Sequence, residues 1–331
     1  MSGLKKNEEQ LFYFMKCSWK HQLINFLLFF SVYFSVHAQS KYCVDEIRDL
    51  KLQSISGRIQ TYYSEGMEKR ASELKTLLER ASVSLSDSLN LEINLILAAL
   101  GPKEWAQVLD KTYGLPTFRT DACKKDGGSF PEPKYVAIVP GAIDGPLYND
   151  WIALKDSLSS KALQKLKEAG MRFEQGGKLM IDFVALHELG HAYHLKFGIK
   201  NYVNFFSEFM ANYVAYAFLR STEERLDKKV LAILSANIET ITPVHSSFTK
   251  WEKFRSSEHP PTEAWYNSVI TLKAAEIYEQ RGFEFLYAIR KAFPEAEGQL
   301  NTETIIARMD TIHPGILIWS EGISELVKRS K

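Results

Sequence analysis

The stretch DFVALHELGHAYH, residues 182–194, constrains this chain most, because it places two histidines four residues apart among apolar neighbours. On an α-helix, residues four apart lie one turn apart along the axis and about 40° apart around it. His187 and His191 therefore point the same way, while Glu188 is rotated away from them. Two imidazoles on adjacent turns can direct their ring nitrogens at one metal ion. The stretch thus predicts a helix that carries half of a metal site.

The order His-Glu-x-x-His suits one kind of chemistry in particular. A bound zinc ion lowers the pKa of its water towards ~7, and Glu188 can take the proton of that water and pass it on. The alternative is a structural helix with core histidines, since a short motif can arise by chance in a chain with eight histidines. Gly190 favours the metal site, because a glycine in a helix is easier to understand where another segment approaches closely.

A catalytic zinc ion needs a third protein ligand and one open position. His194 lies on the same face as His187, but seven residues span ~10.5 Å along a helix, too far to share one ion. We therefore expect His194 to pack or to contact solvent. The three-histidine spacing H-E-x-x-H-x-x-G-x-x-H is excluded, because it needs a histidine at the position of Phe197.

Glu208 is the better candidate for the third ligand. It lies in an apolar stretch after a turn, where a second helix could run antiparallel to the first and bring it opposite the histidines. Ala211, Asn212 and Ala215 follow at helical spacing, and small residues allow two helices to approach closely. Asn212 can also hydrogen-bond a ligand. Glutamates 223–224 are alternatives in a polar stretch.

The sequence HELGH followed by SEFMANYVAYAF, within residues 182–219, resembles the zincin metallopeptidases of the gluzincin type. The pattern E-x-x-A-N is also similar to that of ImmA/IrrE-type peptidases. The resemblance implies Zn²⁺ held by His187, His191 and Glu208, with Glu188 as the general base. In such folds a sheet precedes the motif helix, and its edge strand holds the substrate in extended form. The segment YVAIVP resembles that edge strand in position.

The oxyanion formed during peptide hydrolysis needs a hydrogen-bond donor besides the metal. In gluzincins this is often a tyrosine or histidine beyond the motif. The candidates here are Tyr213, Tyr216, His245 and His259. We expect the two tyrosines to pack in the core, and we take His259, in the rigid segment SSEHPPT, as the candidate catalytic residue. A loop histidine that is merely solvated is the alternative.

Strand patterns precede helical patterns along the chain, which predicts an α+β fold. On the resemblance above, the expectation is a zincin-like single domain over 39–331. It would have a sheet-containing lobe to about residue 175 and a helical lobe over 176–331. Helices are expected from Cys43 to about Ser84 and over most of the C-terminal half, and strands at 89–100, near Phe118 and at 134–140.

The region 1–38 predicts a secretory signal peptide. The apolar run within 21–40 follows basic residues, and the small or aliphatic residues before Gln39 favour cleavage after Ala38. Met15 gives a more typical length for the basic region, so it is a possible true start. The alternative is an uncleaved membrane anchor, although the run is shorter than the ~20 residues of a span. We therefore expect a secreted or periplasmic protein.

Two cysteines, Cys43 and Cys123, remain after such cleavage, an even pair in a chain bound for an oxidising compartment. They could form one disulfide, or stay two separate buried thiols. The formal net charge of +1 gives no indication of nucleic acid. The expected partner is a peptide or protein substrate, with membrane contact only through an uncleaved signal segment.

Two functions are compatible with these residues. The first is a secreted zinc-dependent metallopeptidase, anchored in the membrane if the signal segment is retained. The second is a catalytically inactive, zincin-like binding protein that keeps the metal site for recognition.

Overall fold

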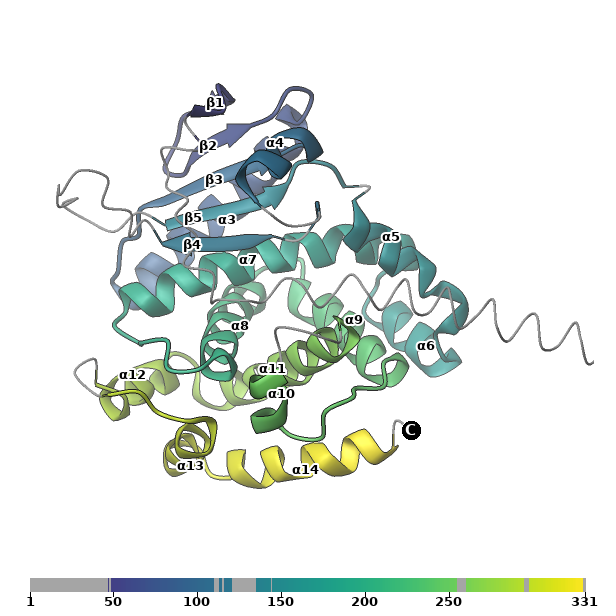
Figure 1. The fold of residues 1–331 in the computed structure, drawn as a ribbon, viewed down its shortest axis with the longest axis vertical. Helices are drawn as coiled ribbons and strands as arrows, with labels where there is room; N and C mark the ends of the chain where they lie inside the picture. Colours follow the sequence, from purple (N-terminus) through teal and green to yellow (C-terminus); the bar gives the residue numbers. More distant parts are fainter. Residues whose placement is uncertain are drawn as a thin grey trace, which may run out of the picture.

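The computed structural model describes residues 47, 49–109, 113–114, 116–120, 135–143, 145–254, 260–294 and 298–329. It has an α+β fold in which a small sheet lies against a larger body of helices (Figure 1). Within these residues, no helix has both the length and the apolar character that a membrane span requires. The expected signal peptide, the two cysteines at 43 and 123, and His259 lie outside the described residues.

The sheet has five strands in the order β1-β2-β3-β5-β4. The three central strands run parallel, and the two edge strands are antiparallel to their neighbours. The inner strands β3 and β5 are buried at every position, which fits their continuous apolar sequences and a sheet covered on both faces. The strands are β1 (Gln53–Ile55), β2 (Gln60–Tyr63), β3 (Leu95–Leu100), β4 (Thr117–Thr120) and β5 (Tyr135–Pro140).

Alternate residues of the inner strands belong to two separate cores. Leu97 and Ala137 face the large core, which they share with α3 (Glu68–Leu89) and α7 (Gly176–Lys196). Ile96 and Val136 face a smaller core under α4 (Pro102–Val108), whose Trp105 is fully buried. The metal-site helix predicted from the sequence is α7, and it therefore lies directly against one face of the sheet.

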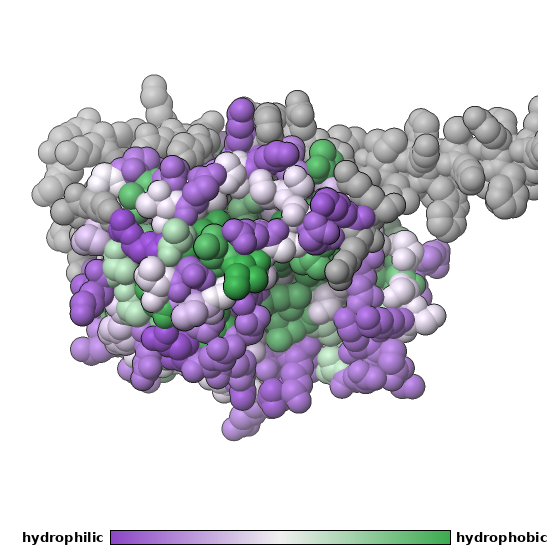
Figure 2. Space-filling view, turned by 90° about the horizontal axis from the view of Figure 1, so that it is seen from below, coloured by the Kyte–Doolittle hydropathy of each residue, from purple (hydrophilic) through white to green (hydrophobic). Residues whose placement is uncertain are grey.

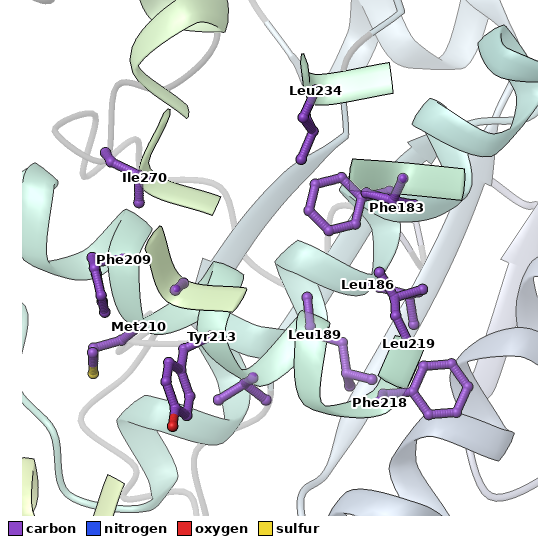
Figure 3. Close-up of a cluster of buried hydrophobic side chains, with 14 of the residues drawn as sticks. Phe183, Leu186, Leu189, Phe209, Met210, Tyr213, Phe218, Leu219, Leu234 and Ile270 are labelled. Carbon is purple, nitrogen blue, oxygen red and sulfur yellow. The ribbon is translucent and has the colours of Figure 1, made fainter. Parts of the chain in front are cut away.

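The C-terminal half consists of helices gathered around α7 and α8 (Figure 1). Both central helices are buried on nearly all sides, and their apolar side chains join one continuous core (Figure 3). The helices besides α3, α4 and α7 are α5 (Pro146–Ala153), α6 (Ser160–Glu168), α8 (Asn204–Ser221), α9 (Leu226–Thr240), α10 (Phe248–Phe254), α11 (Pro260–Arg281), α12 (Glu284–Ala292), α13 (Thr302–Ile312) and α14 (Ile316–Arg329).

The lower face of the molecule has a hydrophilic rim, and hydrophobic residues gather near its centre (Figure 2). Helix α14 lies at this end of the molecule and exposes Leu317, Ile318 and Leu326. Scattered surface hydrophobic residues are normal in folded proteins, so this face alone indicates no particular function.

Three expectations from the sequence are wrong in detail. The helix expected from Cys43 is present at residues 47 and 49, but Gln53–Ile55 and Gln60–Tyr63 form β1 and β2, because the apolar residues near Ile55 and Ile59 recur across two short strands and the bend between them. The strand expected over 89–100 begins only at Leu95, since α3 extends to Leu89 and Asn90 then takes a left-handed conformation. The expected edge strand β5 lies inside the sheet, and β4 forms the edge next to it. The short strand expected at Phe118 is confirmed as β4.

Candidate metal centre

The helices α7 and α8 cross with their backbones in contact. A Cβ atom added to Gly190 would lie 2.3 Å from the carbonyl oxygen of Ala211, so only glycine fits at this crossing. The close approach inferred from Gly190 and the small residues of α8 is therefore confirmed. Because the backbones touch, side chains on either side of the crossing are brought to one place without having to span a gap.

Three side chains from the two helices converge beside the crossing. The Nε2 atoms of His187 and His191 lie 3.1 Å apart. The carboxylate of Glu208 lies 3.1 Å from the first of these nitrogens and 3.9 Å from the second. All three residues are buried, and Glu208 has no exposed surface. The three residues predicted as metal ligands are thus brought together, and they could hold a metal ion.

The distances between the donor atoms fit a tetrahedral ion. With metal–ligand bonds of ~2.0–2.1 Å, the corners of a tetrahedron lie about 3.3 Å apart. Two observed separations, between the two Nε2 atoms and between Nε2 of His187 and Oε2 of Glu208, are 3.1 Å and close to that value, while the other carboxylate oxygen, Oε1, lies 3.9 Å from Nε2 of His191. A buried carboxylate facing two imidazole nitrogens is also stabilised by a cation between them, because burying a charge without compensation is costly. Nitrogen and carboxylate donors suit zinc and several other divalent transition metals, so the donor set alone does not identify the ion.

Asn212 fixes the orientation of the first histidine. Its Oδ1 lies 2.8 Å from Nδ1 of His187. An amide oxygen only accepts hydrogen bonds, so Nδ1 of His187 donates, and in the neutral ring Nε2 keeps its lone pair. That lone pair is the one directed at Glu208 and His191. Asn212 therefore makes a hydrogen bond to one of the predicted ligands, as the sequence suggested.

The second histidine has two polar neighbours of its own. Nδ1 of His191 lies 3.2 Å from Nε2 of His194 and 3.2 Å from Oγ of Ser207. His194 is buried, and burial lowers its pKa to about 4. It is therefore neutral near pH 7. His194 is not one of the three converging residues and is packed in the interior, as expected, but it lies one helical turn after His191 and also contacts that side chain directly.

The metal-free cluster favours a proton on His187. Burial by itself would lower the pKa of His187, but the hydrogen bond and charge of Glu208 outweigh it, with further contributions from Glu188 and Asn212, and the pKa is raised. Glu188 is buried on α7, and its negative charge lies near enough to His187 to raise the pKa of that histidine. The predicted general base thus belongs to the same electrostatic cluster as the ligands.

The edge strand β4 borders the site. The ring of Phe118 stacks on His191 at a centroid distance of 5.6 Å, and Tyr135 of β5 stacks on the same phenylalanine at 5.6 Å. This contact brings the edge of the sheet beside the ligands. No local sequence signal predicted it, because it depends on the order of strands in the sheet.

The position of Glu208 depends on how α8 begins. The carboxylate of Glu252, from α10, accepts hydrogen bonds from the backbone N–H groups of Asn204 (3.0 Å) and Phe205 (2.9 Å). These N–H groups belong to the first turn of α8 and have no partner within the helix. A carboxylate at this end also interacts favourably with the helix dipole. Glu252 thus anchors the helix one turn before the third ligand.

The other candidates lie elsewhere. Tyr213 donates to the carbonyl of Gly282 (2.6 Å) and Tyr216 to Glu279 (2.8 Å), so both hydroxyls face α11 and its end, as expected for packing residues. The backbone carbonyl of His245 accepts a hydrogen bond from Tyr266.

The alternative ligands Glu223 and Glu224 are exposed, and Glu224 pairs with Arg80 at 3.4 Å.

Comparison of the chain with protein-family models, with curated proteins and with solved structures finds no match. The function is therefore inferred from the site.

Proposed function

We propose that this protein is a zinc-dependent metallopeptidase with a gluzincin-like metal site. The observation that carries the proposal is the convergence of His187, His191 and Glu208 from two touching helices, with Glu188 beside the first histidine. A catalytic zinc site needs three protein ligands, an open position and a nearby base. The order His-Glu-x-x-His at 187–191 and a glutamate on the next helix supply the ligands and the base.

The residues divide the work of peptide hydrolysis between them. His187, His191 and Glu208 would hold the ion. When bound, zinc would lower the pKa of a water molecule and polarise the scissile carbonyl. Glu188 would accept the proton of the attacking water and later donate it to the leaving amine. Asn212 would keep the Nε2 lone pair of His187 directed at the ion throughout.

The edge strand β4 is the best candidate for the substrate seat. Among the described strands it pairs only with β5, so its outer edge can accept an extended peptide through backbone hydrogen bonds. Phe118 links this strand to the metal ligands through its contact with His191. A peptide added to β4 would therefore run close to the ion. This replaces the expectation that YVAIVP holds the substrate.

The alternative is a zincin-like binding protein without turnover. Such a protein has no need of a base, and Glu188 would then be free to vary. The presence of both the ligands and the base in this chain favours catalysis. The proposal also includes an extracellular or periplasmic location, which N-terminal sequencing of the mature protein would test by finding Gln39 as the first residue.

The test is a comparison of Glu188→Gln with the native enzyme on a peptide library, read by mass spectrometry. Glu188→Gln should bind zinc with near-native affinity but lose at least ~100-fold in kcat/KM, as expected for a missing general base. Glu224→Gln, an exposed glutamate, is the matched control and should cleave normally. Native rates from Glu188→Gln would reject the assigned base. Stoichiometric zinc in the native protein without cleavage of any peptide would favour the binding protein.

A further inference from the structure

A chain of hydrogen bonds leads from the end of α7 to the second histidine ligand. The Nδ1 atom of His194 lies 3.2 Å from the carbonyl oxygen of Ile199, and its Nε2 atom lies 3.2 Å from Nδ1 of His191. His194 is only 1% exposed, so these contacts are shielded from water. The two hydrogen bonds of His194 thus join a backbone carbonyl to a ring nitrogen of His191.

The chain can run in one direction only. A carbonyl oxygen accepts and never donates, so Nδ1 of His194 must donate to Ile199. The neutral ring then has its lone pair on Nε2, which accepts from Nδ1 of His191. His191 in turn keeps its own lone pair on Nε2, the atom that lies 3.1 Å from Nε2 of His187. The backbone carbonyl of Ile199 thus determines which nitrogen of a metal ligand is available.

Ser207 cannot determine the tautomer of His191. Its hydroxyl also lies 3.2 Å from Nδ1 of His191. A hydroxyl can either donate or accept, so it is compatible with both tautomers of His191. His194, whose Nδ1 donates to the carbonyl of Ile199, can only accept at Nε2 and is compatible with one tautomer of His191.

The backbone at the end of α7 places the carbonyl that starts the chain. Gly198 has φ +87°, and the N–H of Ile199 donates to the carbonyl of His194 (2.9 Å) while the N–H of Gly198 donates to that of Leu195 (3.0 Å). This is the Schellman arrangement, which relies on a left-handed residue that is usually glycine. It folds Ile199 back over His194, so that the two residues contact each other through backbone and side chain.

We propose that His194 is a positioning residue for the metal centre, which holds His191 in the tautomer that binds the ion, and that the glycine-capped end of α7 holds His194 in turn. This inference rests on the proposed metal site and deepens it. It adds a residue that the helical spacing had excluded only as a ligand of the ion.

The test measures metal binding with Co²⁺, whose visible spectrum reports the geometry of its ligands, and needs no peptide substrate. In His194→Leu the acceptor is lost while the bulk is largely kept. We expect Co²⁺ affinity to fall about 10-fold to 100-fold, the usual effect of losing a partner of a metal ligand, with an altered spectrum. His194→Gln places an amide oxygen near the position of Nε2 and should restore most of both.

Two controls separate this role from packing. His313→Leu replaces another buried histidine, whose ring meets that of Phe285 edge to face, and should leave Co²⁺ affinity and the spectrum unchanged. Gly198→Ala and Gly170→Ala each place a side chain at a positive φ, +87° and +68° respectively. Both should lower the melting temperature, but only Gly198→Ala should lower Co²⁺ affinity. That pair decides the question if His194→Leu fails to fold.

The outcomes separate this inference from the proposed function. A native protein that binds no Co²⁺ would overturn the metal site itself. If the native protein binds Co²⁺ but folded His194→Leu keeps native affinity and spectrum, the role of His194 is rejected and the peptidase proposal stands. Equal losses in His194→Leu and His194→Gln would also reject it, because the hydrogen-bond acceptor would then make no difference.

Discussion

The two faces of α8 differ in what they are made of and in what they do. The face towards α7 carries small and polar residues, among them Glu208, Ala211 and Asn212, and it touches the neighbouring backbone. The opposite face carries aromatic side chains that pack on the helices behind it. Residues Phe206, Phe209 and Tyr213 contact Phe293 and Phe285 with ring centroids 4.7 to 6.3 Å apart.

The rear face of α8 mainly stabilises the fold, whereas the front face mainly sets the position of Glu208. Large aromatic side chains bury much apolar area, so the rear face supplies most of the free energy that α8 contributes to folding. The front face buries little area per residue, but the contact of Gly190 with Ala211 fixes where Glu208 meets the histidines. A helix that carries a buried ionisable side chain needs both the aromatic face and the closely packed face, because burying the charged group itself costs free energy.

Removing an aromatic ring from the rear face should have the largest effect on stability. Phe285→Ala, which removes contacts to Phe209 and Tyr213, should lower the free energy of unfolding by about 3–5 kcal/mol. The affinity of the remaining folded molecules for Zn²⁺ should stay near the native value. Urea unfolding and zinc titration at low temperature measure the two quantities. A parallel collapse of zinc affinity would show that the two faces are not separable.

Adding a side chain at the backbone contact on the front face should cost less stability but more zinc affinity than removing the ring of Phe285. Gly190→Ala should lower the free energy of unfolding by about 1–3 kcal/mol, since the added methyl group meets backbone that cannot yield. It should also weaken zinc binding by at least 10-fold, because α8 must move away and take Glu208 with it.

The matched control for this change is Gly322→Ala, in the exposed helix α14, where an added Cβ meets nothing within 4 Å. It should be neutral or stabilise by up to about 1 kcal/mol, with zinc affinity intact. Native zinc affinity in Gly190→Ala would mean that the position of Glu208 does not depend on the crossing.

Acid should destabilise the metal-free protein through His194, which lies on α7. Burial lowers the pKa of His194 to about 4, whereas an unfolded histidine has a pKa near ~6.5. Between these values the unfolded chain binds more protons than the folded one. The free energy of unfolding therefore falls as the pH falls, by about 3 kcal/mol across the range. Urea unfolding in EDTA across this range should show the fall in the native protein and a smaller one in His194→Gln.

His187 acts in the opposite direction and at higher pH. Its pKa in the metal-free protein is raised, so the stability that its proton contributes is fully present below ~6.5 and is lost as the pH rises through the raised value.

Phe285→Leu, a change on the rear face, should shift the whole pH profile of the free energy of unfolding without changing its shape. A native profile in His194→Gln would contradict the assignment of the acid loss to His194.

The smallest effect is expected from the hydroxyl beside His191. Ser207→Ala should weaken zinc binding by no more than about fivefold, or about 1 kcal/mol, because His194 still accepts the N–H of His191. Competition with a zinc-binding dye measures the change. An effect larger than that of His194→Leu would give Ser207 the role that we assign to His194.

Parts of this site were predictable from local sequence and parts were not. His187 and His191 follow from helical geometry, and Glu208 from the rarity of a glutamate among phenylalanines in a buried helix. The contact of His194 with His191 does not follow from its spacing to His187, since it depends on the ring of the residue three positions before it. Phe118 could not be foreseen, since it reaches the site through the pairing of β4 outside β5.

The fold divides in the same way. The α+β class and the helices α7 and α8 follow from apolar patterns and from glycines at helix ends. The strands β1 and β2 were mistaken for helix, because three or four residues are too few to establish an alternating pattern. Strand order is decided by tertiary packing, so YVAIVP could be recognised as a strand but not placed inside the sheet.

The anchoring of α8 by Glu252 has a consequence for the order of events during synthesis. A ribosome completes both histidines and Glu208 well before it reaches α10, whose carboxylate caps the first turn of α8. A nascent chain that has just emerged past residue 221 therefore carries every metal donor but leaves that turn unanchored. That turn would gain its cap only after about thirty further residues, once Glu252 has been added to the chain.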